Sequence, residues 1–197
     1  MPETTDARTI ELPGDWPLLV DDVLTAAADR RPVVLLDGGS GSGKTTLARA
    51  LRRELAARLG PVQLVSLDDC YPGWHGLALA SQWVWQTILA PDEPGHPTWD
   101  WRHDEVSGWV PLDPERPIIV EGCGAISIRS APLASSRLWY EVSADERKRR
   151  ALGRGDGDGF RPWWDDWAEQ EAALWSVNRP WRLADWVVHG DLEASPD

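Results

Sequence analysis

LLDGGSGSGKTTL, residues 35–47, is the stretch that decides which fold we expect. An apolar run typical of a buried strand is followed by glycines and serines, then by a lysine and two threonines. The residues from Gly38 to Thr45 match the pattern G-x-x-x-x-G-K-[ST], and a helical pattern follows them. Glycines let the backbone N–H groups point inward, and such a nest donates hydrogen bonds to phosphate oxygens. The stretch therefore predicts a phosphate-binding loop.

A phosphate-binding loop explains why a lysine, and not an arginine, stands at position 44. Only two of the twenty basic residues are lysines, Lys44 and Lys148. A flexible ammonium can reach over the loop to the β- and γ-oxygens of a nucleotide, a role that suits a planar guanidinium less well. Thr45 can offer its hydroxyl to Mg²⁺, and the helix that begins near Lys44 adds the positive end of its dipole. We expect the bound nucleotide to contact Gly38, Gly39, Ser40, Gly41, Ser42, Gly43, Lys44, Thr45 and Thr46.

Length and charge limit the classes of protein to which the chain can belong. Its 197 residues suit one packed domain, and its formal charge of −12 argues against a broad nucleic-acid-binding face. No apolar run approaches the roughly 20 residues that span a bilayer, and no signal-peptide pattern begins the chain. Cys70 and Cys123 have neither a disulfide-framework nor a metal-binding spacing. We expect a cytoplasmic protein without nucleic-acid or membrane partners; a homodimer stays open.

Hydrophobic periodicity predicts that strands and helices alternate. Residues 1–13 look loose, and region 91–116, rich in Pro and Gly, is long for a plain loop, so it is functional or holds a small hairpin. We expect strands at 33–37, 62–67, 117–122, 137–143 and 184–190, and helices at 16–30, 45–59, 77–89, 144–154 and 162–176. This alternation predicts a single α/β domain over residues 1–197, a three-layer P-loop NTPase fold with a parallel sheet.

The remaining motifs narrow the class of P-loop protein. The chain has no guanine-reading N-K-x-D and no L-S-G-G-Q-like signature, which argues against GTPases and ABC ATPases. In order, GGSGSGKTT, VSLDDCY, TWDWRHD, IIVEGCGA, an arginine-rich helix and ADWVVHG resemble the uridine kinase-like branch of nucleoside and nucleotide kinases, over about residues 33–190. The resemblance implies five parallel strands in the order 2-3-1-4-5, a helical arginine-bearing lid at about 144–160, ATP with Mg²⁺ as donor, and a small acceptor.

Two carboxylates match positions that carry the chemistry in that family. Asp68 follows the second strand, where it could accept or orient the proton of an acceptor hydroxyl; a turn or helix-capping aspartate is the alternative. Glu121 ends the third strand in the Walker B position, where it would face Mg²⁺ together with Thr45. Tyr71 matches an acceptor-contacting tyrosine, and Cys70 stands where the family often has an aromatic residue.

Region 91–116 adds candidates for acceptor binding. Within TWDWRHD, Asp100 could bind a ribose-like diol, Trp101 could stack on a ring, and Arg102 could meet a carboxylate or phosphate. In uridine kinases this neighbourhood holds a D-H-P-type motif, to which the present segment is a loose match. A hairpin packed by its own tryptophans is the alternative.

An arginine-rich helix is the candidate lid. Arg147, Arg150 and Arg154 fall at i, i+3 and i+7, so they share one helix face. In the family, such arginines close onto the transferring phosphates. We expect Arg150 to contact the nucleotide and Arg154 to act catalytically, with hinge-like freedom from neighbouring glycines. A solvated helix face is the alternative.

Together these features predict a phosphotransferase in which Lys44, Asp68 and Arg154 act on the γ-phosphoryl group of ATP. By resemblance the acceptor is a nucleoside or nucleoside monophosphate. The alternative acceptor is a sugar, vitamin or antibiotic hydroxyl, and the alternative class is a non-catalytic ATP-binding regulator. Asp68, Glu121 and the basic helix argue against a regulator, because a sensor needs no acceptor-side base and no closing lid.

Overall fold

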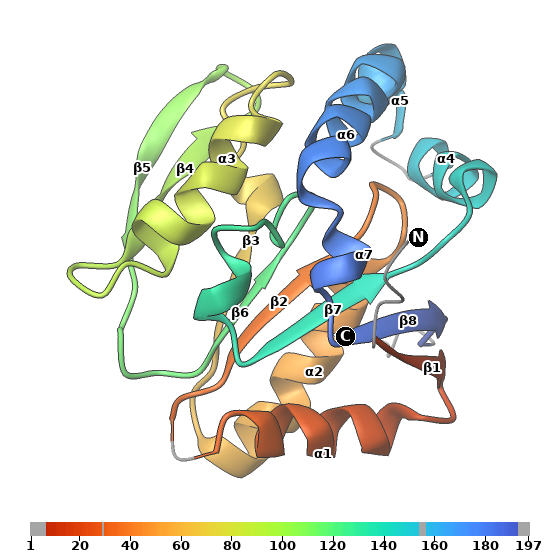
Figure 1. Cartoon of the computed structure of the whole chain (residues 1–197). Helices are drawn as coiled ribbons and strands as arrows, with labels where there is room; N and C mark the ends of the chain where they lie inside the picture. Colours follow the sequence, from red (N-terminus) through yellow and green to blue (C-terminus); the bar gives the residue numbers. More distant parts are fainter. Residues whose placement is uncertain (1–6, 29, 154–156, 193–197) are drawn as a thin grey trace.

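The computed structural model describes residues 7–28, 30–153 and 157–192. Figure 1 shows the path of the chain through its elements. In chain order they are β1 Arg8–Leu12, α1 Trp16–Ala26, β2 Val33–Asp37, α2 Lys44–Leu59, β3 Gln63–Ser66, η1 Leu67–Asp69, α3 Leu77–Trp83, η2 Val84–Ile88, β4 Gly95–Asp100, β5 Glu105–Pro111, β6 Ile118–Glu121, η3 Ala131–Leu133, β7 Ser136–Tyr140, α4 Ala144–Leu152, α5 Gly157–Phe160, η4 Arg161–Trp163, α6 Trp164–Asn178, α7 Pro180–Leu183 and β8 Trp186–Gly190.

The main sheet has six strands in the order β1-β8-β7-β2-β6-β3, and all neighbouring pairs are parallel. The predicted five-stranded sheet is therefore wrong in strand number, and the order of the whole sheet differs, because β1 adds a sixth strand beside β8. The five expected strands keep the predicted order 2-3-1-4-5, as β3-β6-β2-β7-β8. Residues 1–13 were also wrongly expected to be loose throughout. In β1, Ile10 and Leu12 are buried while their neighbours are exposed, and Ile10 pairs with Val188. This alternation is typical of a strand with one face on the core.

Helices cover both faces of the sheet (Figure 1). All five residues of β2 are buried, as expected for a central parallel strand. Val34 and Leu36 face a core shared with α1 and α2, whereas Val33 and Leu35 face a core shared with α3 and α6. The structure is therefore an α/β fold with a parallel sheet between two helical layers.

Region 91–116 holds the hairpin that was one of its two predicted alternatives. Strands β4 and β5 pair antiparallel, with an irregularity in register between Thr98 and Trp99. The hairpin stands apart from the main sheet, on the side of α3 (Figure 1). Every residue of β5 is exposed.

None of the helices described here is long and apolar enough to cross a membrane. In parallel α/β sheets, ligands bind in the crevice beyond the carboxyl ends of the strands. The loop after β2, the turn after β3 and the end of β6 all lie at that edge, and they provide the candidate site.

Candidate active site

The loop at residues 38–43 joins the end of β2 to the first turn of α2. Gly41 and Gly43 have φ angles of 81° and 97°, in the left-handed region that favours glycine. A Cβ on Gly41 would also lie 2.2 Å from the backbone oxygen of Arg147, because α4 packs against the loop. Both the backbone conformation and this close approach therefore require glycine at position 41.

Lys44 lies folded over this loop. Its side chain is almost fully buried, and Nζ donates a hydrogen bond to the backbone oxygen of Gly39 at 3.1 Å. Burial acts to lower the pKa of Lys44, but nearby acidic groups, led by Cys123 and Glu121, outweigh burial and raise it. A buried cation is thus maintained at the loop, as binding of phosphate oxygens requires.

The predicted metal ligands are in direct contact. Glu121 lies at the end of β6 and is 2% exposed, and its Oε1 accepts hydrogen bonds from Thr45 Oγ1 at 3.0 Å and Ser66 Oγ at 2.7 Å. Burial first, and then the charge of Asp68, raise the pKa of Glu121. Two strand ends and the first turn of α2 therefore place hydroxyl and carboxylate oxygens at one point.

These oxygens fit Mg²⁺ rather than a metal held by protein alone. Within the described ranges, no group of three or more His, Cys, Asp or Glu could hold a metal ion. Mg²⁺ needs no such group, because it uses one or two carboxylates together with nucleotide phosphates and waters. Thr45, Asp68 and Glu121 line the same cavity as the loop. The donor set is therefore suited to Mg²⁺ beside a polyphosphate.

Asp68 also lines this cavity and lies in η1, directly after β3. The cavity has a volume of about 520 Å³, and Asp68, Lys44 and Glu121 all contribute to its lining. The backbone oxygen of Asp68 accepts a hydrogen bond from Trp101 Nε1 at 2.8 Å, which ties the hairpin to this turn. Asp68 therefore shares one cavity with Lys44, Thr45 and Glu121, and its role toward an acceptor stays a prediction.

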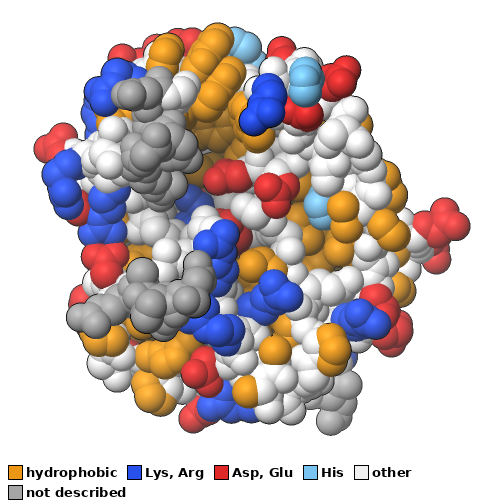
Figure 2. Space-filling view, turned by 180° about the vertical axis from the view of Figure 1, so that it is seen from behind, with side chains coloured by type: hydrophobic (Ala, Val, Ile, Leu, Met, Phe, Trp, Pro, Cys, Tyr) orange, Lys and Arg blue, Asp and Glu red, His pale blue; other side chains and the backbone are white. Residues whose placement is uncertain are grey.

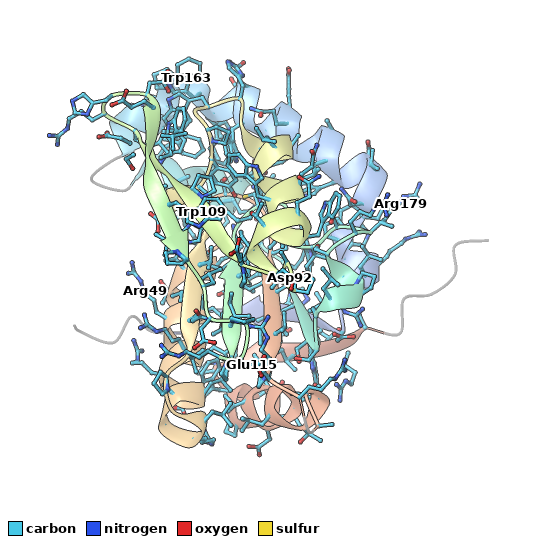
Figure 3. The ribbon with its side chains drawn as sticks, turned by 90° about the vertical axis from the view of Figure 1, so that its left-hand side faces the viewer. Arg49, Asp92, Trp109, Glu115, Trp163 and Arg179 are labelled. Atoms are coloured by element: carbon cyan, nitrogen blue, oxygen red, sulfur yellow. The ribbon has the colours of Figure 1, made fainter. Side chains whose placement is uncertain are left out.

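Five of the residues that line the cavity are aromatic, and we call them the aromatic wall. They come from the loop after η1, the hairpin tip, α5 and α6, and comprise Tyr71, Trp74, Trp101, Phe160 and Trp167. Trp74 stacks on Phe160 at 5.5 Å between ring centroids and on Trp163 at 5.6 Å. Figure 3 shows Trp163 at the end of the molecule where many side chains crowd between the hairpin and α6. Trp167 is buried in the core and also borders the cavity, a position that helical spacing alone does not indicate.

Of the four predicted acceptor residues, two line the cavity and two lie outside its described lining. Tyr71 lines the cavity and is fully buried, and its hydroxyl donates to the backbone oxygen of Cys123 at 2.9 Å. Trp101 also lines the cavity. Asp100 and Arg102 lie at the hairpin turn, outside the described lining, where Asp100 Oδ1 accepts a hydrogen bond from the backbone N–H of Arg102 at 2.8 Å. Their roles toward an acceptor stay predictions.

The lid arginines have protein partners in this structure. Arg150 donates to both oxygens of Asp191, at 2.7 and 2.8 Å, and its Nε donates to Glu146 at 2.6 Å. These contacts raise the pKa of Arg150 and keep α4 beside the end of β8. Arg154 lies outside the described residues. The expected roles of Arg150 and Arg154 toward the nucleotide stay predictions.

Two buried carboxylates at the loop were missed from the sequence. Asp37 ends β2 and accepts backbone hydrogen bonds from Gly38, Gly124 and Ile126 at 2.7, 3.1 and 2.8 Å. Glu171 reaches the loop from α6. The available signal for Glu171 was its position four residues after Trp167, on the apolar face of a predicted helix, where a glutamate needs a partner.

Comparisons with known proteins agree with this architecture. No protein-family model and no curated protein matches the sequence. Among solved structures, a possible uridine kinase from Bacillus stearothermophilus matches with a TM-score of 0.65 and 19% identity, covering 90% of this chain and 99% of its own. A protein from Silicibacter sp. TM1040 assigned as a fructose transport system kinase matches with a TM-score of 0.57 and 19% identity, covering 86% of this chain and 97% of its own.

Both similarities concern the fold, because identity is low in each case. They confirm the resemblance to uridine kinase-like P-loop kinases at that level. Neither residue roles nor an acceptor follow from them, since one fold carries many activities.

Proposed function

We propose that this protein is an ATP- and Mg²⁺-dependent phosphotransferase that moves the γ-phosphoryl group to a hydroxyl of a small molecule. One observation carries the proposal. Lys44 and Thr45 on the phosphate side, Glu121 at the metal position and Asp68 on the acceptor side all line a single cavity of about 520 Å³. The kinase folds of the structural neighbours support the same class of reaction.

Each group has a defined task in the proposed reaction. Asp68 takes the proton of the acceptor hydroxyl as that oxygen bonds to the γ-phosphorus, and the bond from phosphorus to the β–γ bridging oxygen breaks, so that ADP leaves. Lys44 and the backbone N–H groups of the loop hold the phosphate oxygens. Thr45 and Glu121 would hold Mg²⁺, which neutralises part of the phosphate charge when bound.

The acceptor is the finer part of the proposal. The resemblance favours a nucleoside or nucleoside monophosphate, and a sugar, vitamin or antibiotic hydroxyl is the second candidate. The second candidate gains support from the hairpin, because Asp100 and Arg102, the residues expected to read a ribose or a phosphate, lie outside the described lining.

A steady-state assay of ADP release tests the proposal. We expect that an acceptor stimulates ADP release by the wild type, and that Asp68→Asn lowers this stimulation by about 100-fold or more. Lys44→Ala should weaken Mg·ATP binding, measured by calorimetry and by the increase in Tm that ATP produces.

Asp69→Asn is the matched control for Asp68→Asn, because Asp69 is the next residue, is exposed and does not line the cavity. If Asp69→Asn lost as much stimulation as Asp68→Asn, the assignment of Asp68 as base would be wrong. A wild-type protein that fails to bind Mg·ATP would contradict the proposal as a whole.

A further inference from the structure

The aromatic wall is a continuous apolar surface. Trp74 contacts Trp101 at 4.7 Å between ring centroids, and Tyr71 contacts Trp167 edge-on at 4.8 Å. Trp74 also meets Trp167 almost at a right angle, at 6.4 Å. Rings this close to one another leave no space for a ligand between them. A ligand in the cavity therefore lies against the ring faces and edges that line it, which suits a flat apolar group.

The wall lies directly beside the candidate base. The indole N–H of Trp101 donates to the backbone oxygen of Asp68, so the ring is held next to this residue. The turn that carries Trp101 is itself fixed, because Asp100 Oδ1 accepts from the backbone N–H groups of Arg102 and His103 at 2.8 and 3.1 Å. An apolar ring that packs on Trp101 would thus bring a hydroxyl substituent near Asp68.

The charged side chains of the lining determine which net charge of an acceptor the cavity favours. Among the described residues of the lining, Asp68 and Glu121 are acidic and Lys44, the first residue of α2, is cationic. No Arg, His, Asn or Gln side chain of the described residues lines the cavity. The lining therefore lacks a described cation for an acceptor phosphate or carboxylate and lacks side-chain amides for the edge of a nucleobase. Figure 2 shows, near the middle of one face of the molecule, hydrophobic side chains above a group of acidic ones, with basic side chains below them.

From these observations we infer that the acceptor is an uncharged or cationic alcohol that carries a flat apolar ring, bound on the aromatic wall. This inference rests on the proposed phosphotransfer and specifies its substrate class. The acceptor oxygen gains the γ-phosphoryl group, its proton passes to Asp68, and ADP leaves, as in the proposed reaction. Carboxylates and aromatic faces both favour a cationic acceptor over a neutral one.

Three para-substituted benzyl alcohols test the inference, because they share one ring and one hydroxyl but differ in charge. They are 4-(hydroxymethyl)benzylamine, 4-(hydroxymethyl)benzamide and 4-(hydroxymethyl)benzoate. We expect kcat/KM for acceptor-dependent ADP release to fall in that order, with the anion at least about 10-fold below the amide, as one like-charge contact predicts. Uridine, uridine monophosphate, fructose and ring-free glycerol complete the panel. We expect each of them to give a lower kcat/KM than the amide.

Variants of the wall give a second readout, equilibrium binding of 4-(hydroxymethyl)benzamide without nucleotide, measured by calorimetry. Trp74→Leu should weaken this binding and raise KM about 10-fold with kcat little changed, because stacking area is lost. Trp74 also packs against the core, so Trp101→Leu is the second variant; Trp101 is 39% exposed, and its loss leaves the core intact. Trp85→Leu is the matched control, since Trp85 lies in η2 and outside the cavity lining.

Each outcome has a distinct meaning. A higher kcat/KM for uridine monophosphate, or equal values for the amide and the benzoate, overturns the acceptor class but leaves the phosphotransferase. The same conclusion follows if Mg·ATP binds and no ring-bearing alcohol binds or stimulates ADP release. If Mg·ATP does not bind to the wild type, the proposed function itself fails.

Discussion

The backbone N–H of Ser40 donates a hydrogen bond of 2.7 Å to Glu171 Oε1, so a buried carboxylate from α6 is held against the phosphate-binding loop. Its other oxygen accepts from Arg147 Nη1 at 3.2 Å, and Arg147 also donates to the backbone oxygen of Ser40 at 3.1 Å. The carboxylate of Glu171 from α6 and the guanidinium of Arg147 from α4 thus both form hydrogen bonds with the backbone of Ser40. In this arrangement the amide of Ser40 serves Glu171, although the sequence assigned Ser40 to the nucleotide.

The Glu171–Arg147 pair should contribute strongly to stability. Glu171 is 2% exposed and Arg147 11%, and removing one partner of a buried pair costs about 3–5 kcal/mol because the other charge is left without compensation. We expect Glu171→Gln to lower the free energy of unfolding by roughly this amount, measured by urea denaturation. Glu169→Gln, an exposed position on the same helix, should change it by less than about 0.5 kcal/mol. Similar values for the two variants would show that the pair is not stabilising.

Glu121 should control the dependence on Mg²⁺. Its Oε1 accepts from Thr45 and Ser66, and we expect Glu121→Gln to weaken the apparent affinity for Mg²⁺ about 10- to 100-fold, measured by titrating Mg²⁺ against ADP release. Because the pKa of Glu121 is raised, the carboxylate is protonated at a higher pH than an ordinary glutamate. Apparent Mg²⁺ affinity should therefore fall as pH is lowered, and this fall should be reduced in the Gln variant.

The control for Glu121 is Glu115→Gln. Glu115 is exposed and lies far from Trp163, in the other half of the molecule (Figure 3). Its replacement should leave the Mg²⁺ titration unchanged. An equal loss of affinity in this variant would point to a general charge effect instead of a metal ligand.

Asp37 should make stability depend on pH. Burial raises the pKa of this carboxyl from 3.8 to about 7, against the opposing effect of three backbone hydrogen bonds. A carboxyl whose pKa is raised by folding contributes stability that is complete below its unfolded pKa and is lost as pH rises through its folded pKa. The stability advantage of the wild type over Asp37→Asn should therefore fall between about pH 4 and pH 7. Denaturation curves across this range measure the difference, and a constant difference would contradict the raised pKa.

Two variants distinguish a role of Arg150 in nucleotide binding from a role of the Arg150–Asp191 pair in holding α4 in place. If Arg150 contacts the nucleotide as predicted, Arg150→Met should weaken Mg·ATP binding by about 10-fold or more. Asp191→Asn should leave this affinity unchanged or improve it, because it releases Arg150 from a bidentate contact at 2.7 and 2.8 Å. Calorimetric titration of both variants decides the matter. Equal losses of affinity would show that the pair acts only by holding α4 in place.

Much of the fold could be predicted because its signals are local. The period of apolar residues placed β2 and α2 to within a residue, and it located α1, α6 and the parallel strands of the centre. The strand β1 was missed although Ile10 and Leu12 alternate with exposed residues, because five residues at a sheet edge give a weak pattern. Its pairing with β8, from the far end of the chain, is what stabilises it.

The candidate site was predicted in part for the same reason. Lys44, Thr45, Asp68 and Glu121 each follow or end a strand, and parallel strands bring such positions to one edge of the sheet. Asp100 was a candidate for acceptor binding, with a self-packed hairpin as the alternative; in the structure its carboxylate accepts hydrogen bonds within its own hairpin turn, and its role toward an acceptor stays a prediction. Motif spacing carries no information on how a hairpin folds back on its own residues.

By itself, the sequence determined the glycine-rich loop between β2 and α2 and the alternation of strands and helices, because both depend on neighbouring residues and on backbone conformations that glycine or apolar periodicity impose. Only the tertiary structure decided that Glu171 meets Ser40 and that five aromatic rings from four segments border one cavity. Such contacts join residues far apart in the chain. They form where α5, α6, the hairpin and the loop after η1 pack against one another, and no local pattern encodes that packing.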